Sequence, residues 1–64
     1  MIRVNGEEVN ILETNLEQVL LELGYRTDRV AVELNGDIVR REDRVKVILK
    51  DGDVLEVVSF VGGG

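Results

Sequence analysis

The sequence contains no cysteine, no histidine and no tryptophan, and it has only one phenylalanine and one tyrosine. Without cysteine, the chain cannot form the disulfides that stabilise small secreted domains. Without cysteine and histidine, it lacks the usual ligands of zinc and other transition metals, so we expect no metal site. The same absences remove the commonest general base and the strongest nucleophile, which argues against an enzyme with catalytic residues of its own.

Positive charge is also scarce, because 13 acidic residues outnumber 8 basic ones and give a net charge of −5. A chain of this charge repels the phosphate backbone and cannot gain from counterion release, so we exclude DNA and RNA as ligands. The few aromatic residues leave no platform on which unpaired bases could stack. An acidic surface instead favours a basic protein partner.

Long apolar runs are missing, and the first residues do not have the pattern of a signal peptide. We therefore expect no membrane association and a cytoplasmic location. The 64 residues, 44% hydrophobic and 33% charged, are typical of one small soluble domain. A domain of this size buries only about 60% of the surface that its unfolded chain exposes.

Two Asn-Gly pairs, at residues 5–6 and 35–36, predict two β-hairpins. Asparagine and glycine both tolerate the positive φ angles of a type I′ turn, which matches the twist of the flanking strands. Alternating apolar residues on either side give the strands that these turns connect. The four strands expected are residues 1–5, 8–12, 30–34 and 38–39.

A helix is predicted between the two hairpins, over residues 15–23. Thr14 and Glu17 have the spacing of a capping box, in which both side chains bond to free backbone N–H groups. Gly24 then provides the left-handed residue that commonly ends a helix. The apolar residues share one helical face, at Leu16, Val19, Leu20 and Leu23.

The most β-prone segment is residues 54–60, which follow a turn at residues 51–53. Leu55 and Val57 share one face of this strand, and the opposite face is also largely apolar, as expected of a central strand. The segment before the turn, residues 40–50, begins with a charged stretch and then alternates. It fits either a strand or an extended loop that places side chains in the core, and its conformation stays open.

The order of these elements predicts an α+β fold, the ubiquitin-like β-grasp. In this fold a mixed sheet of four to five strands packs on one helix, and the first and last strands lie parallel at the sheet centre. We expect residues 1–60 to form this domain and residues 61–64, which end in three glycines, to form a flexible tail.

The chain resembles the ThiS family of ubiquitin-like sulfur carriers along its whole length. The segments that carry the resemblance are NGE at residues 5–7, the expected helix, AVELNG with IV at residues 31–39, LKDGD at residues 49–53, and residues 57–64. Two positions depart from the family: Val39-Arg40-Arg41 stands where Val-Pro-Arg is common, and Arg44 where the residue is often aromatic. The MoaD family of molybdenum-cofactor carriers is similar in fold and tail but usually longer, so it ranks second.

The resemblance implies a chemistry at the carboxylate of Gly64. A ThiF-like adenylyltransferase would form a glycyl adenylate there, and sulfur from a donor such as a cysteine desulfurase would convert it to a thiocarboxylate, a 1-thioglycine. Thiazole synthase, ThiG, would then receive the sulfur. The carrier itself would bind no cofactor and would be a cosubstrate. The residues agree, because the chain has no thiol to carry sulfur and no phosphate-binding loop to bind ATP.

The glycines have a physical role in this hypothesis, because a tail of Gly62, Gly63 and Gly64 has no side chains and could enter a narrow partner active site. Val58 and Phe60, on the outer face of the last strand, are candidates for partner docking, although they could instead pack under residues 40–50. Arg40 and Arg41 are interpreted as solvated.

Three other functions remain open. The chain could be a MoaD-like sulfur carrier of molybdopterin synthase. It could be a ubiquitin-like modifier whose Gly64 is joined to a lysine of a target protein. It could also be a binding module that shares only the fold, in which case the tail would be dispensable.

Overall fold

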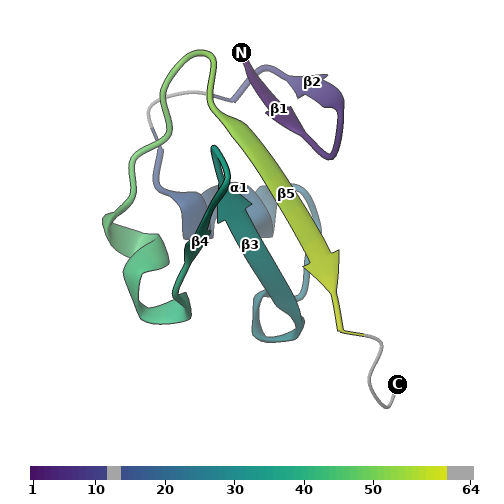
Figure 1. Ribbon diagram of the computed structural model, residues 1–64, viewed down its shortest axis with the longest axis vertical. Helices are drawn as coiled ribbons and strands as arrows, with labels where there is room; N and C mark the ends of the chain where they lie inside the picture. The colour runs from purple at the N-terminus through teal and green to yellow at the C-terminus, as the bar shows by residue number, and fades with distance from the viewer. Residues whose placement is uncertain (12–13, 61–64) are drawn as a thin grey trace.

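In the computed structural model, residues 1–11 and 14–60 are described, and five of their segments form one mixed sheet (Figure 1). The strands are β1 (Ile2–Val4), β2 (Glu7–Val9), β3 (Val30–Leu34), β4 (Asp37–Val39) and β5 (Val54–Ser59). Their order across the sheet is β2-β1-β5-β3-β4. β1 and β5 pair in parallel at the centre, while the other neighbours are antiparallel, which confirms the expected β-grasp arrangement.

Both predicted hairpins are present, and their turns have the expected backbone. Asn5 and Asn35 have φ angles of 50° and 51°, and the glycines that follow them have 88° and 91°. Two successive positive φ angles define the type I′ turn. The returning strand of the first hairpin is shorter than predicted, because β2 ends at Val9.

The asparagines of these two turns also hold the central strand β5 from both sides. The side-chain oxygen of Asn5 accepts a hydrogen bond from the backbone N–H of Val57 (2.8 Å), and its amide nitrogen donates to the carbonyl of Val57 (3.1 Å). From the other side, the side-chain oxygen of Asn35 accepts from the N–H of Val54 (2.9 Å). Each turn therefore satisfies backbone groups of β5 that the adjacent strand does not reach.

The predicted helix is present as α1 (Leu16–Glu22), but its capping residue is Asn15 and not Thr14. The Asn15 side chain accepts from the N–H of Gln18 (2.8 Å), so the expected box of Thr14 with Glu17 is wrong by one position. The reason lies far away in the sequence. The Thr14 carbonyl accepts from the N–H of Leu49 (3.0 Å), which keeps residue 14 in an extended segment outside the helix.

The end of α1 is as predicted. Gly24 has a φ of 88°, and two backbone bonds close the last turn: Gly24 N–H donates to the Leu21 carbonyl and Tyr25 N–H to the Leu20 carbonyl, both at 3.0 Å. This pair of bonds is the Schellman motif, and it requires the left-handed residue that glycine supplies.

Residues 40–50, which the sequence left open, combine a 3₁₀ helix with an extended stretch. The 3₁₀ helix η2 spans Arg41–Lys46 and lies beside α1. Ile48 then forms an isolated antiparallel bridge with Asn15, and Leu49 is only 1% exposed. The second half therefore does place a side chain in the core, whereas Val45 points to solvent.

The hydrophobic core lies between α1 and one face of the sheet, the face turned away from the viewer in Figure 1. The buried residues come from β1, α1, β3, β5 and the extended stretch after η2. They are Ile2, Val4, Leu16, Val19, Leu20, Val30, Val32, Leu49, Leu55 and Val57. Each fully buried aliphatic side chain contributes about 1.5–3 kcal/mol to stability. Among the described residues, none of the helices has the length and apolar character needed to cross a membrane.

Candidate functional site

The end of β5 presents apolar side chains to solvent. Leu55 and Val57 point into the core, so the alternate residues of the strand lie on the opposite, open face of the sheet. Val58 is 62% exposed and Phe60, directly after the strand, is 57% exposed. They therefore do not pack under residues 40–50.

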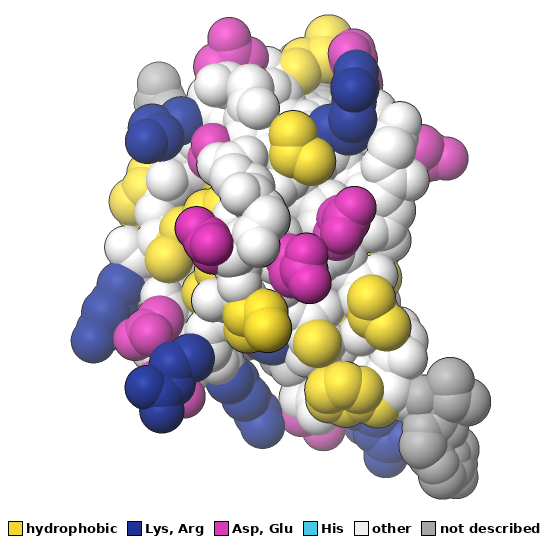
Figure 2. Space-filling view, in the orientation of Figure 1, with side chains coloured by type: hydrophobic (Ala, Val, Ile, Leu, Met, Phe, Trp, Pro, Cys, Tyr) yellow, Lys and Arg dark blue, Asp and Glu magenta, His cyan; other side chains and the backbone are white. Residues whose placement is uncertain are grey.

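Ala31 of β3 extends this exposed surface, since it pairs directly with Val58 across the sheet. The backbone of Phe60 is fixed as well, because its N–H donates to the carbonyl of Arg29 at 2.7 Å. We call Ala31, Val58 and Phe60 the β5-end patch. Figure 2 shows hydrophobic side chains gathered at the lower right of the open face, toward the end of β5.

Acidic side chains lie on the same open face, next to the β5-end patch. Glu33 and Glu56 are direct cross-strand partners in the β3–β5 ladder, two positions along from the pair of Ala31 with Val58 and therefore on the same face of the sheet. Like charges directly opposite each other destabilise a sheet. Figure 2 shows acidic groups in the middle of this face. Ile38, the partner of Glu33 in β4, and Val54 at the start of β5 are exposed as well, so the open face combines acidic and apolar side chains. A partner with apolar and basic groups would complement such a surface.

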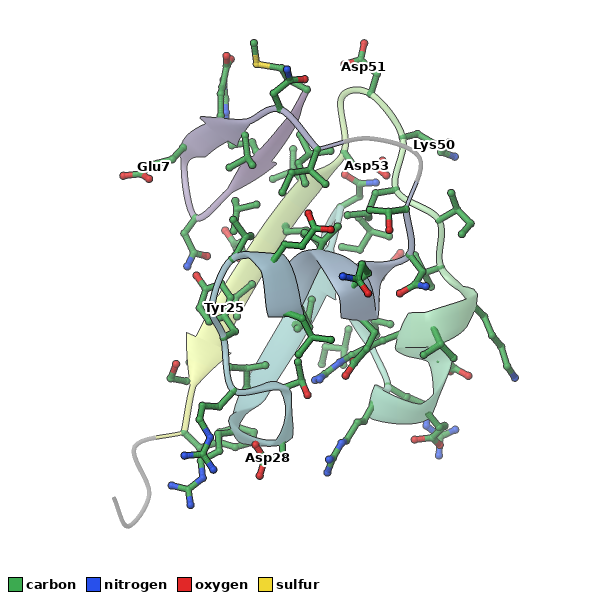
Figure 3. All side chains as sticks on the ribbon, turned by 180° about the vertical axis from the view of Figure 1, so that it is seen from behind. Glu7, Tyr25, Asp28, Lys50, Asp51 and Asp53 are labelled. Atoms are coloured by element: carbon green, nitrogen blue, oxygen red, sulfur yellow. The ribbon has the colours of Figure 1, made fainter. Side chains whose placement is uncertain are left out.

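A polar network at the opposite end of the molecule fixes the start of β5. Asp53 is buried, and its carboxylate accepts from the side-chain amide of Asn35 (3.0 Å) and from the N–H of Lys50 (2.8 Å). Burial raises the pKa of this carboxyl, but the two hydrogen bonds and the charge of Lys50 outweigh it, so the pKa is lowered from 3.8. Figure 3 shows Lys50, Asp51 and Asp53 together at this end and Asp28 at the other. The network is structural and positions the strand.

Next to Asp53 lies a shallow hollow of about 220 Å³, lined by Met1, Ile2, Arg3, Glu8, Gly52, Asp53 and Val54. It is at the start of β5 and not at the β5-end patch. Within the described residues, no group of three or more His, Cys, Asp or Glu side chains could hold a metal ion. The hollow and the β5-end patch are therefore separate features, at opposite ends of β5.

The residues predicted to carry the chemistry, Gly62, Gly63 and Gly64, lie outside the described residues, and their roles stay predictions. Arg40 and Arg41 are exposed, in line with their interpretation as solvated.

The sequence did not reveal Arg44, which is only 3% exposed and donates hydrogen bonds to two backbone carbonyls, those of Thr27 and Val30. The one hint in the sequence was the resemblance noted above, which implies that an aromatic residue often stands at this position.

Comparison with known proteins gives one consistent result. The model of the ThiS family matches residues 2–64. A protein of Paramagnetospirillum magneticum named thiazole synthase is 45% identical over 62 residues, which are 95% of this chain but only 19% of that one. The chain thus spans about a fifth of the length of this relative.

Two ThiS proteins match over nearly their full length. The sulfur carrier protein ThiS of Thermus thermophilus is 38% identical over 64 residues, covering 100% of both chains. The crystal structure of the thiamine biosynthesis protein ThiS from Geobacter metallireducens has a TM-score of 0.80 at 36% identity, covering 98% of this chain and 97% of that chain. The fold is therefore the ubiquitin-like β-grasp of that protein.

Proposed function

The chain belongs to the ThiS family, and from this premise we propose that it carries sulfur for thiamine biosynthesis as a cosubstrate and not as an enzyme. The observation that carries the proposal is the end-to-end alignment with the Thermus thermophilus carrier, which includes the terminal glycines. The described surface supports it, because the exposed β5-end patch, with Glu33 and Glu56 beside it, suits a protein that docks on others.

The chemistry that we propose takes place at the carboxylate of Gly64. A free carboxylate is a poor electrophile, so a ThiF-like adenylyltransferase would first join it to AMP, with pyrophosphate as the leaving group. The terminal sulfur of a donor persulfide, such as that of a cysteine desulfurase, would then displace AMP and form an acyl persulfide. A thiol would cleave its S–S bond, which releases the thiocarboxylate and leaves a disulfide. Gly62 and Gly63, without Cβ atoms, would form the narrow stem that brings this group into a partner's active site.

We propose thiazole synthase, ThiG, as the acceptor of the sulfur. The support is that a segment similar to this whole chain occurs in a longer protein named thiazole synthase. Val58 and Phe60 of the β5-end patch would supply the apolar contact to a partner, and Glu33 with Glu56 would attract its basic residues. An exposed aromatic residue next to apolar neighbours is a typical energetic centre of such interfaces.

The test is the removal of Gly64. We expect the truncated protein to lose adenylation by a ThiF-like enzyme while its circular dichroism spectrum stays unchanged. A second variant carries one extra residue after Gly64. The addition moves the carboxylate outward by about 3.5 Å and removes no part of the chain. This variant should lose adenylation as well, because the carboxylate no longer reaches the same place. Adenylation that persists after truncation would refute the proposal.

Intact-mass spectrometry of the protein isolated from cells separates the other functions. Exchange of one oxygen for sulfur at the C terminus supports a carrier, and transfer of that sulfur to purified thiazole synthase identifies the pathway. Transfer to molybdopterin synthase instead would identify a MoaD-like carrier. A ladder of larger adducts would identify a protein modifier. If the protein is unmodified in cells that make thiamine, the result would count against both a sulfur carrier and a protein modifier.

A further inference from the structure

Arg44 is a buried cation that bonds only to backbone. Its Nη1 donates to the carbonyl of Thr27 (2.8 Å) and its Nη2 to the carbonyl of Val30 (2.7 Å). Its Nε is buried and has no hydrogen-bond partner among the described residues. No carboxylate in the described part of the chain lies within ion-pair distance of it.

Such an arrangement is costly, because a charge removed from water without a counter-ion is compensated only by the hydrogen bonds that it makes. Filling this part of the core does not require a cation, since an apolar side chain of similar volume would avoid the desolvation penalty. What only arginine provides is a rigid planar fork with several donors, which can hold two acceptors in a fixed relation. The two acceptors are therefore the place to look for its role.

The two carbonyls lie on either side of Arg29. The 3₁₀ turn η1 (Thr27–Arg29) leads directly into β3, and its own bond runs from the N–H of Arg29 to the carbonyl of Arg26 (2.8 Å). Arg44 bonds to the first residue of this turn and to the residue that follows it. The fork thus fixes the orientation of the backbone around Arg29.

The carbonyl of Arg29 is the acceptor for the N–H of Phe60, at 2.7 Å. Phe60 is the last described residue before the terminal segment that the proposed function uses. On its other side, β5 has lost its neighbour by this point, because β1 ends at Val4 and the side chain of Asn5 reaches only to Val57. The bond from Phe60 to Arg29 is therefore the final described backbone link between β5 and the body.

From this chain of contacts we propose that Arg44 is a positioning residue for the C-terminal segment. Through its fork on Thr27 and Val30 it holds the Arg29 carbonyl in place, and that carbonyl fixes where the chain leaves the sheet after Phe60. The function of this anchor rests on the proposed function, because it sets the point from which Gly64 would be delivered to the adenylating enzyme.

The structural part of the proposal is tested by hydrogen exchange of single amides, measured by NMR. We expect Arg44→Met and Arg44→Lys each to speed exchange at the Phe60 amide by roughly 10- to 100-fold, the factor that corresponds to loss of a hydrogen bond to a charged group. The amide of Asn5, which donates to the Leu55 carbonyl on the other side of β5 (3.0 Å), serves as an internal reference and should not change.

Arg44→Lys separates the fork from the charge, because lysine keeps the cation and most of the stem but cannot bridge two carbonyls in one plane. It also keeps the test valid if the methionine variant fails to fold. Lys46→Met is the matched control, since it removes an exposed cation from the same 3₁₀ helix. Unchanged exchange at Phe60 in both Arg44 variants, or equal acceleration at Phe60 and Asn5, would overturn the proposal.

The functional part is tested by steady-state adenylation with the carrier as the varied substrate. A looser anchor leaves about one more residue to be ordered on binding, so the KM for the Arg44 variants should rise by about tenfold while kcat stays unchanged. If Arg44 only stabilised the fold, its variants would be less stable but would not show a raised KM at an unchanged kcat. If the wild type is not adenylated, the proposed function fails while the exchange result still decides the role of Arg44.

Discussion

Replacement of Phe60 by alanine tests whether the β5-end patch docks on a partner. Full burial of a phenylalanine side chain contributes about 1.5–3 kcal/mol. Because Phe60 is 57% exposed, that fraction of its surface is available to a partner. Covering it would contribute about 0.9–1.7 kcal/mol, which is about a 5- to 20-fold rise in KM for the variant.

The assay is adenylation by a ThiF-like enzyme, with ATP saturating and the carrier concentration varied. We expect kcat to stay nearly constant, because the alanine variant keeps the terminal carboxylate and the N–H of residue 60 that bonds to Arg29. Stability against urea should also change little, since the side chain lies on the open face and outside the core.

Leu21→Ala is the matched control for this prediction. Leu21 is an apolar residue of similar exposure, 53%, but it lies on α1, which packs against the opposite face of the sheet. Its loss should leave KM unchanged. Equal KM values for Phe60→Ala and the wild type, or equal increases for the Phe60 and Leu21 variants, would refute the assignment of the β5-end patch as a docking surface.

Two further predictions concern charge. Glu56→Gln removes one of two facing carboxylates, so the free energy of unfolding should rise by about 0.2–1 kcal/mol at low salt and by less at high salt. Urea denaturation at both salt concentrations measures this. A gain that is absent or does not depend on salt would contradict repulsion between Glu33 and Glu56. The folded-state pKa of Asp53 is lowered, so its contribution to stability is fully present above the unfolded value of about 3.8 and is lost as the pH falls through the lower folded value. Asp53→Asn should therefore flatten the acid side of the stability profile, and a parallel profile would show that Asp53 does not contribute.

The parts of the fold that sequence predicts are those with local causes. An Asn-Gly pair needs only its own two φ angles to form a turn, and both turns are where the sequence places them. The spacing of apolar residues in α1 and their alternation in β5 depend on geometry within one element, and they correctly identify the core faces. The face proposed for docking follows from the same alternation, because it is the side of β5 that does not face the core.

The parts that sequence misses depend on contacts between distant residues. Thr14 and Asn15 are both good caps, each with a suitable residue three positions later, and local rules cannot choose between them. The bond from Leu49 to the carbonyl of Thr14 decides the choice in favour of Asn15. Arg44 is missed for a similar reason, since its carbonyl acceptors at Thr27 and Val30 are 17 and 14 residues away. A charged stretch in a sequence shows neither of these contacts.

Asn5 and Arg44 hold different parts of β5, the first its centre and the second, through Arg29, its end. Both use a polar side chain to make two bonds to backbone, but Asn5 acts on Val57, where β5 is still paired with β3 on its other side. Loss of Asn5 therefore weakens the centre of the sheet and should lower the stability of the whole domain. Arg44 acts beyond that point, where β3 and its preceding turn are the described neighbours of β5. Its loss should free the last residues of the strand while the core stays folded, so the proposed delivery of the C terminus and the stability of the body should respond to different substitutions.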